Sequence, residues 1–127
     1  MKKRQQLVSI ILNCYNGEKF LRESLLSIKN QTYKKWELIF WDNRSTDNSK
    51  KILTSLKIKN LRYFYSKKHT SLYKARNLAL NKARGEYIGF IDADDMWEKD
   101  KITNQVKLFK EKDIAVVYGN SFLKNEI

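Results

Sequence analysis

The chain has 127 residues, a length that supports one domain with a hydrophobic core and is too short for two. Its 42% hydrophobic content excludes a disordered chain, its single cysteine excludes a disulfide scaffold, and its strand-sized apolar runs exclude a transmembrane helix. The net charge of +12 attracts polyanions, but the lysines are spread along the chain, which favours a solvated basic surface over a specific nucleic-acid site.

The first half of the chain predicts two strands, each followed by a helix. Leu7–Leu12 is an apolar, strand-like run, and the polar residues 13–17 form a turn after it. Helical spacing then appears in four apolar residues: Phe20, Leu21, Leu25 and Ile28. Trp36–Trp41 predicts a second buried strand. Ser45 is expected to cap the next helix, with Asp47 in its first turn. The apolar face of that helix has three residues: Ile52, Leu53 and Leu56.

The second half continues the alternation. Leu61–Tyr65 predicts a third strand, and Tyr87–Ile91 predicts a fourth. The helix between them has five apolar residues on one face: Leu72, Ala75, Leu78, Ala79 and Ala83. We expect Gly85 to be its C-cap. A fourth helix is marked by three apolar residues: Ile102, Val106 and Phe109. Ile114–Tyr118 predicts a fifth strand.

Strands that alternate with helices of this length predict right-handed crossover connections and a mainly parallel sheet. We therefore expect residues 1–127 to form one doubly wound α/β domain with helices on both faces of the sheet. Ligands of such sheets bind at the carboxyl ends of the strands. The turns after three strands carry polar side chains at that edge: residues 13–18, 42–47 and 92–95.

The turn after the fourth strand holds three carboxylates in four positions, Asp92, Asp94 and Asp95. They repel each other unless a cation or a polar ligand offsets their charge, and clustered oxygen ligands suit Mg2+ or Mn2+. An EF-hand loop starting at Asp92 is excluded, because Trp97 and Thr103 replace the required glycine and glutamate. An acidic helix cap is the remaining alternative.

Other common sites lack their residues. No Gly-x-Gly-x-x-Gly follows the first strand and no Walker motif is present, which excludes dinucleotide and P-loop sites. The only histidine, His69, lies in a polar loop, so zinc sites of His and Cys and histidine-based triads are not expected.

Taken together, these residues make the chain resemble the nucleotide-binding half of a family 2 glycosyltransferase, an inverting enzyme of the Rossmann-like GT-A fold. The resemblance runs from about Val8 to Gly119. Five segments carry it in order: Val8–Leu21 with its Tyr-Asn turn, Ser27–Tyr33, Glu37–Ser49, Ala75–Asn77 and Ala83–Asp95.

The resemblance implies a nucleotide site in the first turn. It places Tyr15 against the nucleobase, the alternative being a core tyrosine behind the first strand. Asn13 and Asn16 would offer amides to the base or the ribose, although asparagines in turns also serve the local backbone. Glu18 would reach the base or serve the first turn of the following helix.

It also implies contacts from the later turns. Asp42 or Asn43 would meet the edge of the base, and Asn43 departs from the second acid that is usual in the family. Arg76 would contact the nucleotide, the alternative being an exposed helix arginine in an ordinary ion pair. Thr70 and Ser71 stand where the family often has glycines, which reshapes that loop.

The Asp-x-Asp pair would provide the metal site. Asp92 would face the ribose or the water shell of the metal, and Asp94 would ligate the Mn2+ or Mg2+ that bridges the diphosphate. Asp95 would lie outside the direct ligands of the metal and next to them. Among the ligands, a UDP-sugar is the donor that the family most often uses.

In the family, the residues that bind the acceptor (a saccharide or a lipid-linked sugar) lie beyond the fifth strand, and so does the catalytic base. The acids near the end of this chain match no such motif, so we expect a donor-binding portion that transfers sugar poorly alone. A lone cysteine and the basic charge predict a cytoplasmic protein, peripherally associated with the membrane.

Two other functions stay open at this point. A sugar nucleotidyltransferase has a related architecture but favours a glycine-rich loop after the first strand, where this chain has only Gly17. A non-catalytic domain that binds nucleotides or polyanions would show steep salt dependence and no metal requirement.

Overall fold

The computed structural model describes residues 4–111 and 113–123. Helices and strands alternate in these residues: β1 (Val8–Cys14), α1 (Glu18–Lys29), β2 (Trp36–Asp42), α2 (Ser49–Ser55), β3 (Leu61–Tyr65), α3 (Leu72–Leu80), β4 (Tyr87–Asp92) and α4 (Lys101–Leu108). The strands form one sheet in the order β3-β2-β1-β4, and each neighbouring pair is parallel. The predicted α/β class is confirmed.

Burial along the strands explains this order. Every residue of β2 is buried, and β1 is buried everywhere except at Asn13. Both strands read as near-continuous apolar runs, as expected of parallel strands that helices cover on both faces. The edge strands β3 and β4 are only partly covered, and alternate residues of β4 are exposed.

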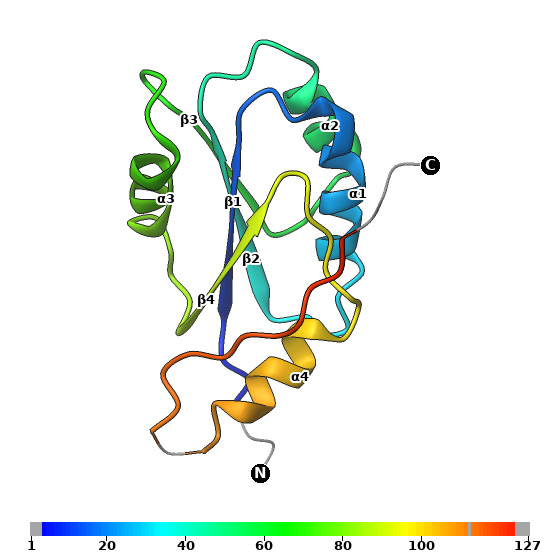
Figure 1. Cartoon of the computed structure of the whole chain (residues 1–127), viewed down its shortest axis with the longest axis vertical. Helices are drawn as coiled ribbons and strands as arrows, with labels where there is room; N and C mark the ends of the chain where they lie inside the picture. Colours follow the sequence, from blue (N-terminus) through cyan, green and yellow to red (C-terminus); the bar gives the residue numbers. More distant parts are fainter. Residues whose placement is uncertain (1–3, 112, 124–127) are drawn as a thin grey trace.

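Helices cover both faces of the sheet, as predicted. In Figure 1, α3 lies on one side of the sheet, and α1 and α2 lie on the other. The larger core cluster joins the sheet to α1, α2 and α4, and includes Leu21, Leu25 and Ile28 of α1. These residues recur at the helical spacing that the sequence shows. The smaller cluster packs Ala75 and Ala79 of α3 against Ile11, Ile39 and Trp41.

Three local expectations are wrong. The helix α2 begins at Ser49 after Asn48, so Ser45 is not its cap. The helix α3 ends at Leu80, which leaves Gly85 beyond it. Residues 114–118 form no strand; apolar residues alone do not make a strand without a neighbouring strand to pair with.

Gly85 instead marks a close approach to the start of β1. A Cβ at this position would lie 2.6 Å from the backbone nitrogen of Ser9 and 2.7 Å from the carbonyl oxygen of Leu7. The backbone amide of Gly85 also donates to the Ser9 hydroxyl at 2.8 Å. Only glycine allows this contact without displacing the backbone. Within residues 4–111 and 113–123, no helix is long and apolar enough to cross a membrane.

Candidate nucleotide and metal site

The carboxyl ends of three strands bring the predicted site residues together. In the sheet register Cys14 is opposite Asp42, and Asn13 is opposite Asp92. The chain builds β2 and β3 on one side of β1 and then crosses to place β4 on the other. The carboxyl end between β1 and β4 is therefore a topological switch point, where sheets of this kind bind ligands.

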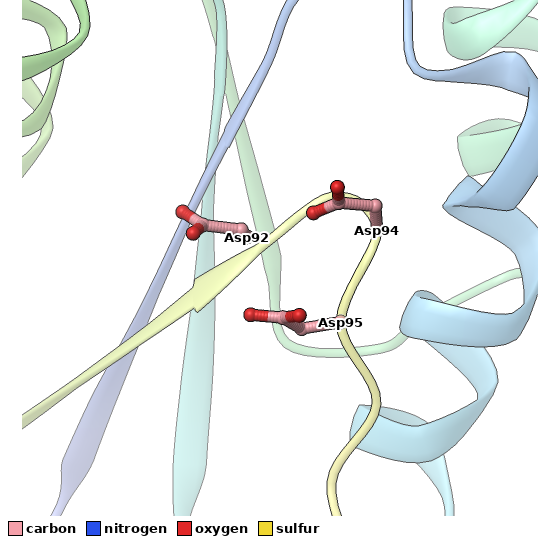
Figure 2. A group of neighbouring side chains, drawn as sticks. All are labelled: Asp92, Asp94 and Asp95. Carbon is pink, nitrogen blue, oxygen red and sulfur yellow. The ribbon is translucent and has the colours of Figure 1, made fainter. Parts of the chain in front are cut away.

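Asp92, Asp94 and Asp95 form a cluster at the end of β4, and Figure 2 shows Asp92 at the end of the strand and Asp94 and Asp95 on the turn that follows. One carboxylate oxygen of each residue lies within 4.8 Å of those of the other two. Burial and the charges of Asp92 and Asp94 raise the pKa of Asp95. The next helix begins only at Lys101, so the cluster is not an acidic helix cap.

The cluster fits a hard divalent cation. Oxygen ligands of Mg2+ lie at about 2.1 Å, so two of them on one ion are at most about 4.2 Å apart. The carboxylates thus need only small side-chain rotations to share an ion. Burial and the neighbouring charges of Asp92 and Asp94 raise the pKa of Asp95, and a divalent cation held by the three carboxylates would offset that repulsion.

Arg76 reaches this cluster from α3. Its Nη2 atom lies 2.5 Å from Oδ1 of Asp92, and the two side chains are 38% and 47% exposed. An exposed pair of this kind contributes little to stability. It does place a guanidinium beside the cluster, and a guanidinium can pair with phosphate oxygens as well as with a carboxylate.

A pocket of about 240 Å3 lies beside β1 and β2 at the same edge. Its lining residues are Asn13, Cys14, Tyr15, Asn43, His69, Thr70, Ser71, Leu72 and Ala75. Tyr15 is 55% exposed, so it is not a core residue. Its ring lies 4.4 Å from the ring of His69, centroid to centroid, at an angle of 57°. Cys14 is buried beneath this edge, and burial raises the pKa of its thiol.

Asn16 and Glu18 connect the first polar turn to the second. Oδ1 of Asn16 accepts hydrogen bonds from the backbone amides of Thr46 at 2.8 Å and Asp47 at 3.3 Å. Asn16 has a φ of 49°, a left-handed conformation that asparagine tolerates well. Oε2 of Glu18 accepts from the backbone and side-chain nitrogens of Asn48, at 3.0 and 2.8 Å. Both side chains therefore fix the shape of this edge.

Asp42 and Asn43 are buried at the end of β2. Asp42 is 1% exposed, and its two oxygens accept from the amide of Ser45 at 2.7 Å and from the hydroxyl of Tyr63 at 2.8 Å. Asn43 is 5% exposed and bonds to Thr70 through both ends of its amide. By contrast, the buried Nδ2 of Asn13, which lines the pocket, has no hydrogen-bond partner among the described residues.

That the loop between β3 and α3 lines the pocket was not predicted from the sequence. His69 and Leu72 come from this loop and from the start of α3, about 55 residues beyond Tyr15 in the chain. The only available signal was the departure of Thr70 and Ser71 from the glycines that are common in the family.

The sequence model described as "Glycosyl transferase family 2" matches residues 9–126 of this chain. The chain belongs to this family.

Named glycosyltransferases that are similar to this chain support its membership of the family. The chain is 39% identical over 117 residues to the UDP-Glc:alpha-D-GlcNAc-diphosphoundecaprenol beta-1,3-glucosyltransferase WfgD of Escherichia coli, covering 90% of this chain and 45% of that protein. It is 34% identical over 117 residues to the putative teichuronic acid biosynthesis glycosyltransferase TuaG of Bacillus subtilis, covering 91% and 46%. The chain thus spans about half the length of these relatives.

Solved structures of similar proteins include bound ligands. S. aureus TarS 1-349 in complex with UDP-GlcNAc superposes with a TM-score of 0.77 at 30% identity, covering 81% of this chain and 31% of that one. The mannosyltransferase PcManGT of Pyrobaculum calidifontis, in complex with GDP-Man and Mn2+, superposes with a TM-score of 0.80 at 26% identity, covering 88% and 34%. This chain therefore shares its fold with proteins that bind nucleotide sugars.

Proposed function

We propose that this chain binds the nucleotide-diphosphate sugar donor of an inverting glycosyltransferase, together with Mn2+ or Mg2+. The observation that carries the proposal is the meeting of three features at one sheet edge. These are the cluster of Asp92, Asp94 and Asp95, the guanidinium of Arg76, and the pocket beside Tyr15. The parts of a donor match these features. The acidic cluster would hold a divalent cation for the diphosphate, the guanidinium would offset further negative charge of the diphosphate, and the pocket with its aromatic ring would take the base.

The position of each residue indicates which part of the donor it would contact. Tyr15 is exposed beside the pocket and offers a ring face to a base. Asn13 lines the pocket, and its buried Nδ2 has no hydrogen-bond partner among residues 4–111 and 113–123, so a small rotation of the side chain would let it donate to a polar ligand atom. Arg76 holds Asp92 in place and adds a positive charge where the diphosphate would lie. A bound divalent cation would offset the negative charge that grows on a departing diphosphate.

The relatives favour a UDP-sugar and a lipid-linked acceptor. WfgD is named for transfer of glucose from a UDP donor to a diphosphoundecaprenol-linked sugar, and TarS was solved with UDP-GlcNAc. PcManGT, however, was solved with GDP-Man, so the base is a matter for direct measurement. Transfer to the acceptor belongs to the whole protein, for which we propose action at the cytoplasmic face of the membrane.

Calorimetric titration tests the donor site. UDP, GDP, CDP and TDP are titrated into the chain, each with Mn2+ and again with a chelator. We expect one nucleotide to bind only with the metal, and Asp94→Asn to abolish that binding. Asp113→Asn, which removes the same charge outside the cluster, is the matched control and should bind as the wild type does.

The outcomes separate the proposal from simple polyanion binding. A polyanion site predicts binding that needs no metal, falls steeply with salt and is unchanged or stronger in Asp94→Asn. That result, or a failure of all four nucleotides to bind with Mn2+, would contradict the proposed donor site.

A further inference from the structure

We propose that Asn43 is a positioning residue that anchors the loop of residues 66–71, so that His69 stands beside Tyr15 as part of the wall of the base pocket. In this arrangement His69 contributes to nucleotide affinity, and the amide of Asn43 serves the loop instead of reading the base. The inference rests on the proposed nucleotide site and assigns two of its residues a role.

The amide of Asn43 is matched to the backbone of Thr70. Oδ1 accepts from the amide nitrogen of Thr70 at 3.1 Å and from its hydroxyl at 3.3 Å, and Nδ2 donates to its carbonyl oxygen at 2.8 Å. This pairing requires a side chain that donates and accepts at once, which asparagine does and aspartate does not. At 5% exposure, Asn43 has little surface left for a ligand.

The rest of the loop is fixed to the same end of β2. The amide of Ser66 donates to the carbonyl oxygen of Asp42 at 2.8 Å, which holds the start of the loop. Nδ1 of His69 lies 3.0 Å from the carbonyl oxygen of Asn43. The loop is thus held at its first residue, at Thr70 and at the imidazole between them.

The hydrogen bond between His69 and the carbonyl oxygen of Asn43 also determines which ring nitrogen carries the proton. A carbonyl oxygen only accepts, so the ring proton must be on Nδ1, and Nε2 of the neutral ring is an acceptor. The ring cannot turn without breaking this bond. It therefore stays 4.4 Å from the ring of Tyr15, and both rings line the pocket.

Asn43 and the two rings therefore have different roles in the pocket. The buried amide of Asn43 determines where the loop lies, and the exposed rings of His69 and Tyr15 present the surface that a base meets. Contact between a base and an aromatic ring in proteins that bind single-stranded nucleic acids raises the affinity by about 5- to 150-fold per base.

Two variants test the two roles. His69→Ala removes the ring and should weaken binding of UDP, measured with Mn2+ by calorimetry, by about tenfold. Asn43→Asp keeps the size of the side chain but removes the donor to Thr70, and should weaken binding through loss of the loop position. Asn104→Asp adds the same negative charge at an exposed position of α4 and is the matched control.

His69 is the only histidine of the chain, so its ring nitrogens give a single set of signals in a long-range 1H–15N NMR spectrum. The wild type and Asn104→Asp should show the form protonated at Nδ1. Asn43→Asp should show the averaged signals of a mobile ring. A substitution whose only effect was lower stability would leave the protonated position of the His69 ring unchanged in the folded protein.

The results are separable from those of the donor-site proposal. If UDP binds the wild type and His69→Ala equally well, the role of His69 is refuted while the donor site stands. If Asn43→Asp keeps both the imidazole signals and the affinity of the wild type, the positioning role of Asn43 is refuted. If no nucleotide binds the wild type, the proposed function fails, and the imidazole signals still decide whether Asn43 holds the loop. Because His69 is exposed, His69→Ala remains informative even if Asn43→Asp does not fold.

Discussion

Replacing Tyr63 by phenylalanine should destabilise the protein through Asp42. The hydroxyl of Tyr63 donates to Oδ2 of Asp42 at 2.8 Å, and Asp42 is 1% exposed. Burial and this bond raise the pKa of Tyr63, so the hydroxyl stays protonated and remains a donor. Phenylalanine would keep the ring stacked on Phe40 and leave the carboxylate oxygen without its donor.

The size of the effect follows from the type of bond. A hydrogen bond to a charged group contributes about 1.5–3 kcal/mol. Tyr63 is only partly buried, which lets water replace some of the interaction, so we expect about 1.5–2 kcal/mol. With an unfolding entropy of roughly 2.1 cal/mol/K per residue over the 127 residues, this corresponds to a fall of about 6–8 °C in the melting temperature.

Thermal and urea unfolding, followed by circular dichroism, measure this change. Tyr65→Phe is the matched control on the same strand, because the hydroxyl of Tyr65 has no hydrogen-bond partner among residues 4–111 and 113–123 and the side chain is 47% exposed. It should leave the melting temperature unchanged. If Tyr63→Phe changed stability by no more than the control, the bond to Asp42 would not hold the end of β2 as argued.

Three further predictions concern other parts of the chain. Gly85→Ala should destabilise the fold by about 1–3 kcal/mol, because the new Cβ would lie 2.6 Å from the Ser9 backbone nitrogen; an unchanged urea midpoint would contradict this. Burial opposes the charged form of Glu37, yet hydrogen bonds from Ser9 and Arg62 prevail and lower its pKa. Its folded pKa thus lies below the unfolded value, so its contribution is present above roughly pH 4.5 and is lost as the pH falls through the folded pKa. The stability difference between the wild type and Glu37→Gln should shrink over that range in urea titrations, and a difference that stayed constant down to pH 3 would refute the assignment. Mn2+ at a hundredfold excess over its Kd should stabilise the wild type by about 2.7 kcal/mol in thermal unfolding and leave Asp94→Asn unchanged, whereas equal stabilisation of both would place the metal elsewhere.

The alternation of patterns along the chain was sufficient to predict the fold class. Runs such as Trp36–Trp41 are too continuous for a half-exposed strand, and the spacing of Leu21, Leu25 and Ile28 matches the helical repeat. Both signals come from residues that are close in sequence. The run Ile114–Tyr118 shows their limit, because the same composition forms no strand in the structure.

The position of the acidic cluster was predictable for the same reason. A strand that ends in Asp92 delivers the following acids to the carboxyl edge, whatever its neighbours are. The ends of β1 and β2 follow from the parallel topology. The sequence was therefore sufficient to predict which edge of the sheet carries the acidic cluster and the pocket, whereas it predicted only Asn13, Tyr15 and Asn43 among the residues that line the pocket.

What each polar side chain does there was decided by the tertiary structure alone. Asn16 bonds to Thr46 across 30 residues, and Asn43 bonds to Thr70 across 27. No local pattern encodes such partners, since they meet only after the sheet has formed. The sequence by itself determined the class of fold and the edge that carries the chemistry. Only the packing of distant turns against one another decided which side chains hold the edge together and which, like Tyr15 and His69, line the pocket.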